Sequence, residues 1–481
     1  MNSYDAIRYP TAPKDQSHPD RLASVAMMYG LSPAPVGRCR VLELGASDGN
    51  NIIPMAYGLP DSEFTGIDMA AAPVAEGQAR IAALGLRNVR LLAMDIMDLA
   101  PSFGEFDYIV AHGIYSWVPT AVRDRILAVC RANLAPGGIA YVSYNAYPGC
   151  HLRRMVREMM LYHIAAIADP VERIQQACSL ASLMAEAQPE EGLRREFEVV
   201  LERTPSVIYH DDIADVNHPV YFHQFAAHAR EHGLQFLAEA TLVAADAHLP
   251  ESVRKILKPL ESDPIRREQY LDFAKLRRFR QTLLCHQEAT VLRPVCHERV
   301  RALYASSMAQ PGPEEPGGAV EFRGEKGAAA KTVHPLAKAA LTVLGRAWPR
   351  RLAFPALLAE ARRASAGAAT AEQDASALSE ILWHTCQAGL VELHAHPGCF
   401  AAAPGPRPVA SAVARLDLRT GAITATLAHG VVEVEDAVSR RLVEMLDGTR
   451  DRATLVVELD VPLAALEATL TRLARLPLLI A

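Results

Sequence analysis

Short apolar runs alternate with helical patterns through the first part of the chain. Five of the runs are predicted to be β-strands, because each is rich in apolar and β-branched residues and ends at a polar residue or a turn. They cover residues 41–44, 64–68, 89–96, 106–113 and 138–144. Strands that alternate with helices usually lie parallel in one sheet. The pattern therefore predicts an α/β fold with a mostly parallel sheet.

Two later segments extend this sheet. Residues 222–237 have the pattern of a helix, a glycine cap and a strand, and residues 281–286 are predicted to form a further strand. With them the prediction becomes a seven-stranded, Rossmann-like sheet. Residues 155–183 instead carry apolar side chains at spacings of three and four, which predicts helices inserted into the sheet domain.

The first apolar run leads into a glycine turn, and a helix is expected to start near Asn51. The turn reads Gly45-Ala46-Ser47-Asp48-Gly49. A strand, a tight turn and a helix N-terminus are the arrangement with which α/β domains hold a nucleotide-like cofactor. The second strand ends at Asp68, where an acid suits the two hydroxyls of a ribose.

The charge near this turn favours one class of cofactor. A dinucleotide site requires G-x-G-x-x-G, and Ser47 stands where that pattern has its second glycine. Glu43 and Asp48 would repel a pyrophosphate. They tolerate S-adenosylmethionine, which carries a sulfonium and an ammonium, so the acids favour that cofactor over NAD.

Other strand ends provide further candidate cofactor residues. Asp95 can accept a hydrogen bond from an adenine amino group, with Ile96 against the ring, and His112 follows the fourth strand. Ligands in such sheets bind outside the carboxyl ends of the strands. The predicted cofactor-binding residues are Glu43, Gly45, Ala46, Asp48, Asp68, Met69, Asp95, Ile96 and His112.

In order and spacing, these motifs resemble those of the class I S-adenosylmethionine-dependent methyltransferases over roughly residues 35–150. Ser47 departs from the commoner G-x-G-x-G of that family without removing the turn. Further motifs resemble the bacterial methyltransferases that carry a methyltransferase regulatory domain, a group that includes the rickettsial lysine methyltransferases of an outer-membrane protein. These motifs lie within 4–23, 113–119, 144–149, 217–222 and 277–284.

This closer resemblance implies N-methylation of lysine in a protein or peptide substrate, and it makes a homodimer plausible. On the fold it implies, methyl transfer needs no metal, because the cofactor is already activated. Two alternatives stay open on the same fold. One is a methyltransferase for a small molecule or a peptide natural product, and the other is a non-catalytic scaffold that binds the cofactor through a degenerate loop.

Residues after the fourth and fifth strands are the candidates for substrate binding and chemistry. His112, Tyr115 and Tyr144 could accept a hydrogen bond from the lysine amine or relay its proton. Aromatic and amide side chains could line the channel for the lysine stem. These substrate-binding candidates are Trp117, Asn145 and Tyr147. An ordinary core or strand-end role is equally compatible with five of these residues, namely His112, Tyr115, Trp117, Tyr144 and Asn145.

The predicted domain organisation has seven parts. They are a lead segment (1–34), the first part of the cofactor domain (35–150), a helical insertion that could form a dimer interface (151–204), the remainder of the methyltransferase domain (205–290), a linker (305–330), a winged-helix-like domain (331–404) and a second small C-terminal domain (405–481). The linker is inferred from its glycine, proline and glutamate residues.

Composition excludes several other classes of protein. A net charge of −6 argues against a dedicated nucleic-acid binder. The eight cysteines are scattered without CxxC pairs, which favours reduced thiols and a cytoplasmic protein. Without an apolar run of about 18 residues, no stable membrane insertion is expected. We expect no metal site, because His384, Cys386, His394, His396 and Cys399 match no common zinc spacing.

Overall fold

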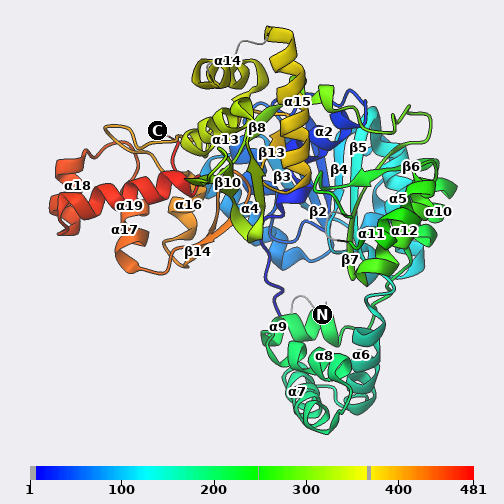
Figure 1. Cartoon of the computed structure of the whole chain (residues 1–481). Coiled ribbons are helices and arrows are strands. Elements are labelled where there is room, and N and C mark those ends of the chain that lie inside the picture. The colour runs from blue at the N-terminus through cyan, green and yellow to red at the C-terminus, as the bar shows by residue number, and fades with distance from the viewer. Residues whose placement is uncertain (1–6, 247–248, 366–369, 481) are drawn as a thin grey trace.

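The computed structural model describes residues 7–246, 249–365 and 370–480, and a seven-stranded sheet forms its centre (Figure 1). The strands run in the order β3-β2-β1-β4-β5-β7-β6, with β7 antiparallel to both of its neighbours. Their bounds are β1 Arg40–Leu44, β2 Glu63–Asp68, β3 Val89–Ala93, β4 Phe106–Ala111, β5 Leu134–Asn145, β6 Leu234–Glu239 and β7 Phe279–His286. The predicted Rossmann-like sheet is confirmed. Of the N-terminal motif, Tyr4 and Asp5 lie outside the described residues.

Alternating side chains of the strands serve two separate cores, one on each face of the sheet. Val41 and Tyr141 belong to one core, whereas Leu42 and Val142 belong to the other. This follows from the two-residue period of a strand. The first core also holds residues of α2 Pro19–Met28, α3 Ile52–Gly58 and α4 Ala71–Leu84. The second core holds residues of α5 Thr120–Asn133 and α10 Phe222–Glu231.

Two strand boundaries differ from the prediction by three residues or more. β3 ends at Ala93 because the Asp95 side chain caps a short 3-10 helix, η2 Ile96–Asp98, by accepting a hydrogen bond from the Met97 amide. β5 begins at Leu134, four residues before the predicted start at 138, and its pairing with β4 is irregular there. The other short helices of this domain are η1 Asp15–Ser17, η3 Pro101–Phe103 and η4 Tyr115–Trp117.

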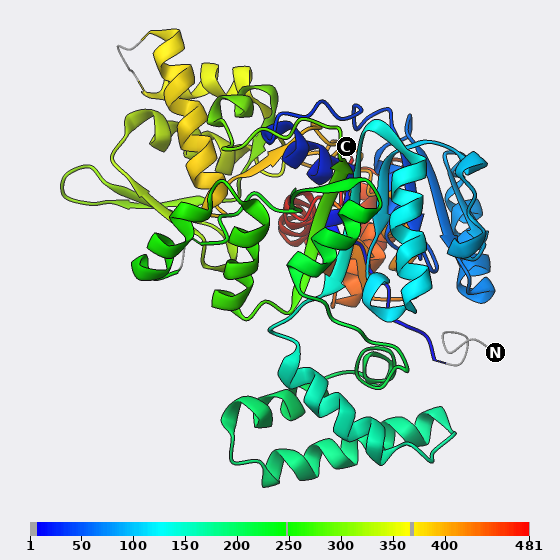
Figure 2. The ribbon, with the colours of Figure 1, turned by 90° about the vertical axis from the view of Figure 1, so that its right-hand side faces the viewer.

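The helical insertion projects away from the sheet domain (Figures 1 and 2). Its core is separate from the two cores of the sheet and includes Val156, Met160 and Phe197. Its helices are α6 His151–His163, α7 Pro170–Ala187, α8 Glu191–Leu201, α9 Pro205–Val207 and η5 Ile208–Asp212. The chain then returns to the sheet through α10 and β6. Helices α11 Glu251–Leu257, η6 Lys258–Leu260 and α12 Pro264–Lys275 precede β7.

Half of the predicted linker over 305–330 is strand. Residues 310–332 form an antiparallel sheet of β9 Gln310–Glu314, β10 Val320–Arg323 and β11 Ala329–Thr332. Two of the three prolines in the predicted linker, Pro311 and Pro313, lie on β9, which is an edge strand, where a missing amide is tolerated. Phe322 on the central strand is almost fully buried and anchors this sheet to the main core.

Two further domains complete the chain. The first holds η7 His297–Ala302, β8 Tyr304–Ser306, η8 Glu325–Gly327, α13 Pro335–Ala347, β12 Leu352–Ala353, α14 Phe354–Ser365, α15 Ala371–Gln387 and β13 Glu392–His394. The second holds α16 Ala412–Asp417, β14 Ile423–Ala425, β15 Val431–Glu433, α17 Ala437–Met445, α18 Arg452–Leu459 and α19 Leu463–Arg475. The first shares the main core, whereas the second has its own. Among the described residues, no helix is both long and apolar enough to cross a membrane.

Candidate active site

The turn after β1 adopts the left-handed backbone that a tight approach to a ligand requires. Gly45 and Gly49 have φ of +75° and +76°, and Ser47 has φ of +50°. A Cβ on Gly45 would lie 2.6 Å from Cγ2 of Ile114, so that position accepts only glycine without rearrangement. Ser47 takes the left-handed conformation that a glycine would take more easily, and the turn is therefore preserved.

Asp68, at the end of β2, is held by backbone amides. Its Oδ2 accepts a hydrogen bond from the Ser47 amide and its Oδ1 accepts one from the Ala70 amide, both at 2.8 Å. Burial raises the pKa of this carboxyl, and the two amide bonds oppose that rise. Each carboxylate oxygen has two lone pairs, so the side chain can accept further hydrogen bonds from a diol.

Glu43, near the end of β1, is buried with only one of its oxygens paired. Its Oε1 accepts a hydrogen bond from Nδ2 of Asn51 at 2.6 Å, and its Oε2 is buried without a partner. Burial raises the pKa of this carboxyl to about 8. An unpaired buried acceptor is costly unless a ligand uses it. A cofactor that brings an ammonium group to this edge of the sheet could donate a hydrogen bond to Oε2 of Glu43. The residues therefore fit the predicted cofactor.

The lead segment lies against the glycine turn. Thr11 donates its hydroxyl hydrogen to the Asp48 carboxylate, with oxygen distances of 2.8 and 2.9 Å. The Lys14 amide donates to Oδ1 of Asn51 at 2.8 Å. Residues 11–14 thus orient the polar side chains around the turn.

The remaining predicted cofactor residues lie at the same edge of the sheet. Asp95 follows β3, and one oxygen of its carboxylate caps η2 through the Met97 amide at 2.9 Å. Ile96 is partly buried against the second core, and Met69 is largely exposed. The ends of β1 to β4 therefore present the acids, Ala46, Met69, Ile96 and His112 along one edge of the sheet.

His112 is fixed by neighbours that the sequence did not single out. Its Nδ1 lies 2.9 Å from the Tyr141 hydroxyl and 3.4 Å from the Ser143 hydroxyl. Gln281 donates to the same Tyr141 oxygen at 3.0 Å, and the ring of Phe279 lies 6.0 Å from the imidazole. Burial lowers the pKa of His112 to about 3, so the ring is neutral at physiological pH.

Three family models match successive parts of the chain. A methyltransferase domain matches residues 41–138, a predicted methyltransferase regulatory domain matches 204–286, and the C-terminal winged helix domain of PKMT matches 406–474. The structure of PKMT2 from Rickettsia typhi in complex with AdoHcy superposes with a TM-score of 0.88 at 25% identity, covering 98% of this chain and all of that one. The chain belongs to the S-adenosylmethionine-dependent methyltransferases.

Two curated relatives come from Rickettsia prowazekii. This methyltransferase is 33% identical to the uncharacterized protein RP028 over 241 residues, which are 49% of this chain and 96% of that protein. It is 36% identical to RP789 over 307 residues, which are 62% of this chain and 55% of that protein. The winged-helix match falls on the last domain, which we had predicted only as a second small domain, rather than on 331–404.

Tyr115 and Tyr144 lie together in the second core of the methyltransferase. Tyr141, which contacts His112, lies in the first core on the other face of the sheet. Their ring centroids are 5.8 Å apart, and both rings pack against Phe225. The Tyr115 hydroxyl lies 2.7 Å from Nδ1 of His228. The Tyr144 hydroxyl lies 3.1 Å from that of Thr282. The structure does not bring either hydroxyl together with His112, whose partners on β5 are Tyr141 and Ser143.

The predicted substrate residues are spread beyond the ends of β4 and β5. Asn145 donates from Nδ2 to Oδ1 of Asn217 at 3.2 Å and lines a small cavity. Tyr147 stacks on His151 with ring centroids 4.2 Å apart, and its hydroxyl accepts a hydrogen bond from Arg154 at 2.8 Å. Trp117 is partly buried in η4. The cavity beside Asn145 is lined by Cys150, Arg153, Arg154, Arg157, Asn217 and Pro219.

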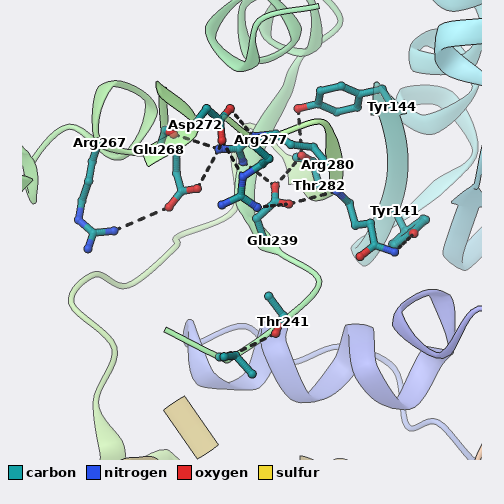
Figure 3. Close-up of polar contacts among 12 residues, drawn as sticks. Tyr141, Tyr144, Glu239, Thr241, Arg267, Glu268, Asp272, Arg277, Arg280 and Thr282 are labelled. Carbon is teal, nitrogen blue, oxygen red and sulfur yellow. Dashed lines mark hydrogen bonds and ion pairs between the residues drawn. The ribbon is translucent and has the colours of Figure 1, made fainter. Parts of the chain in front are cut away.

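A buried ion network lies behind β7, in the part that matches the regulatory domain (Figure 3). Arg280 has no exposed side-chain surface, and it donates to both oxygens of Asp272 at 2.8 Å and to Glu239 at 2.7 Å. Thr282 donates to the same Glu239 oxygen at 2.8 Å. A run of arginines such as that over 277–280 is typical of a solvated or ion-paired face; the ion pairs are present, but Arg280 lies in the core.

The metal ligands considered in the sequence are not brought together. Among the described residues, one group of three possible ligands has its atoms within 4.8 Å of one another, namely Asp124, His228 and His232. Asp124 is exposed, and its carboxylate already pairs with His228 at 2.6 Å and with His232 at 3.7 Å. His228 and His232 are four residues apart at the end of α10, but Asp124 lies on α5, so local spacing indicates only two of the three residues.

We expect Asp68→Ala to weaken AdoHcy binding by about tenfold or more, because a charge-assisted hydrogen bond contributes about 1.5–3 kcal/mol. Isothermal titration calorimetry measures the change. Asp61→Ala is the matched control, since Asp61 is exposed and precedes β2, at the other edge of the sheet. An unchanged dissociation constant for Asp68→Ala would refute its assignment to the ribose.

Proposed function

We propose that this chain N-methylates lysine side chains of a protein substrate. The observation that carries the proposal is its similarity along almost the whole chain to PKMT2, a rickettsial PKMT whose structure holds AdoHcy. The chain spans 55% of the length of RP789, so the proposal concerns the activity of the segment that the sequence covers. The insertion and the C-terminal domains exceed what a small-molecule substrate requires, which also favours a protein.

The residues at the carboxyl edge of the sheet are proposed to bind different parts of the cofactor. We assign Asp68 to the ribose hydroxyls, Asp95 to the adenine amino group and the Gly45 turn to the methionine end. S-adenosylmethionine supplies a methyl group on a positively charged sulfur, which makes a metal unnecessary. The protein has to align the acceptor nitrogen with that methyl group, because most of its contribution is orientation.

A lysine amine has to be neutral before it can attack, and its ordinary pKa is about 10.4. Desolvation lowers the pKa of an amine. Phe279, with 40% of its surface exposed, lies beside His112, and the His112 ring stacks on Tyr141, so an amine that enters here would leave water between aromatic rings. His112, being neutral, adds no repelling charge. We propose that His112 and Tyr141 orient the amine.

The other candidate residues fall into two groups. Trp117, Asn145 and Tyr147 are proposed to contact the substrate chain. Tyr115 and Tyr144 are proposed to support the channel wall from the opposite face, since their hydroxyls are engaged with His228 and Thr282.

We also propose that the helical insertion mediates self-association in a cytoplasmic protein. It carries exposed apolar side chains, including Met155, Tyr162 and Leu183. Sedimentation equilibrium of the wild-type chain and of Tyr162→Glu tests this assignment. We expect a dimer for the wild type and a shift towards monomer for the variant.

Labelling tests the proposed activity directly. The purified chain is incubated with methyl-labelled S-adenosylmethionine and a heat-treated bacterial lysate, and the products are separated by mass. Label on lysine in protein bands, absent when Asp68→Ala replaces the wild type, is the expected result. Label confined to low-mass material would show a small-molecule methyltransferase. Binding of AdoHcy without turnover on any fraction would instead favour the non-catalytic scaffold.

A further inference from the structure

The C-terminal domain reaches the base of the cofactor site through the loop between β14 and β15. This loop places His429 against Asn51, with Nε2 of the imidazole 3.0 Å from Oδ1 of the amide, and His429 is buried. His429 has φ of +64°, a left-handed conformation that is unfavourable for a residue with a Cβ. Unfavourable backbone of this kind persists where the surroundings demand it, and it clusters at functional sites.

The donors and acceptors around Asn51 determine which way its side-chain amide points. The Lys14 amide can only donate, so the atom that it contacts at 2.8 Å is the amide oxygen of Asn51. The nitrogen of Asn51 therefore faces Glu43 and donates to Oε1 at 2.6 Å. His429 in turn has to donate from Nε2 to the same oxygen. Burial holds the pKa of His429 well below its ordinary value, consistent with a neutral ring that carries its hydrogen on Nε2.

A second connection from the same domain ends at the same turn. Asp417, the last residue of α16, pairs with Arg80 of α4 at 2.8 Å, and Thr424 of β14 donates to Asp417 at 2.9 Å. Arg80 also donates to the side-chain oxygen of Asn50. Asn50 then donates from Nδ2 to the Asp48 carboxylate at 3.0 Å. Two independent chains of polar contacts thus lead from one hairpin region to residues 48–51.

We propose that the C-terminal domain is a positioning part of the cofactor site, acting through His429 and Asp417 on residues 48–51 and on Glu43. This inference rests on the proposed function, in which that site binds S-adenosylmethionine. His429 and Asp417 are positioning residues, because they act through Asn51 and Arg80. Binding free energies are reciprocal, so a ligand in the cofactor site also stabilises the docked hairpin.

Two substitutions of His429 distinguish the role of its N–H donor in positioning Asn51 from the contribution of its bulk to packing. His429→Gln keeps an N–H donor near the position of Nε2, whereas His429→Leu keeps the bulk and removes the donor. We expect His429→Leu to weaken AdoHcy binding about tenfold and His429→Gln to stay within about threefold of the wild type, as measured by isothermal titration calorimetry. His384→Leu is the control, since His384 is an exposed histidine on α15. We expect it to bind AdoHcy like the wild type.

Asp417→Asn gives an independent test should His429→Leu fail to fold, and we expect a loss of about threefold or more. Hydrogen exchange provides a readout that a purely structural role would not move. AdoHcy should slow amide exchange over residues 423–433 in the wild type and not in His429→Leu. The inference is overturned if the wild type binds AdoHcy and folded His429→Leu and Asp417→Asn bind it equally well. Wild-type protein that binds no AdoHcy would instead overturn the proposed function itself.

Discussion

Arg280→Met is expected to lower the free energy of unfolding by about 3–5 kcal/mol, because it leaves the buried acids around Arg280 without their main counter-charge. The guanidinium binds Asp272 and Glu239, lies 3.0 Å from Glu268, and stacks 3.9 Å above the ring of Phe222. Methionine can fill part of the volume but donates no hydrogen bond. Urea unfolding followed by circular dichroism measures the loss.

The dependence of this loss on pH identifies its cause. Burial raises the pKa of Glu239, but Arg280 and then Arg277 lower it, and the net shift is downward. A carboxyl with a lowered pKa stabilises the fold above its unfolded pKa, and this contribution disappears as the pH falls. The difference between wild type and Arg280→Met should therefore shrink as the pH falls below the ordinary glutamate pKa of about 4.3.

Arg267→Met is the matched control for Arg280→Met. Arg267 lies at the edge of the same network, where its side chain is partly exposed and pairs with Asp246 at 2.6 Å. Partly exposed ion pairs contribute about 0–1 kcal/mol, so this variant should unfold close to the wild type. Equal losses for the two arginines, or no loss for Arg280→Met, would contradict a buried network that needs Arg280.

The contrast between these arginines marks a limit of sequence reasoning. A run of three arginines within four residues has the composition of a solvated face, and nothing local distinguishes Arg280 from Arg278. The difference arises because Glu239 and Asp272 approach Arg280 from β6 and α12, which pack on β7 only in the folded chain. Arg278 is instead about half exposed and pairs with Glu196 of the insertion.

The cofactor edge could be predicted because its determinants are local. An apolar strand, a glycine turn and a terminal acid are encoded within a few residues, and parallel strands bring such ends to one edge. Strand alternation could also have separated Tyr141 from Tyr144, since residues an odd number apart point to opposite faces. The same alternation would have placed Tyr141, rather than Tyr144, on the face of the sheet that carries His112. The contact of His429 with Asn51 spans 378 residues, and no local pattern indicates it.

The three-stranded sheet over 310–332 was missed for a different reason. Its strands are short, and β9 has no buried side chain, so the apolar alternation that identifies a strand is absent there. Only Val320 and Phe322 on β10 carry the pattern. A linker and an exposed edge strand share their proline-rich composition, and pairing with β10 decides between them.

Glu43 should make cofactor affinity depend strongly on pH. Its pKa is raised to about 8 chiefly by burial, so the carboxyl is largely protonated at pH 6 in the free protein. The ammonium of AdoHcy favours the ionised carboxylate, so binding should release a proton from Glu43. Affinity then rises with pH below that pKa, by at most about tenfold per unit. We expect an increase of about 10- to 30-fold between about pH 6 and 7.5.

Glu43→Gln separates this titration from other effects of pH. Glutamine keeps an oxygen that can accept the hydrogen bond from Asn51, but it does not ionise in this range. Its affinity for AdoHcy should be lower than that of the wild type at pH 7.5 and nearly constant between the two pH values. Calorimetry in buffers of different ionisation enthalpy should also detect proton release for the wild type alone. Parallel pH profiles for the two proteins would show that Glu43 does not face the ammonium group, and the unpaired Oε2 would then need another explanation.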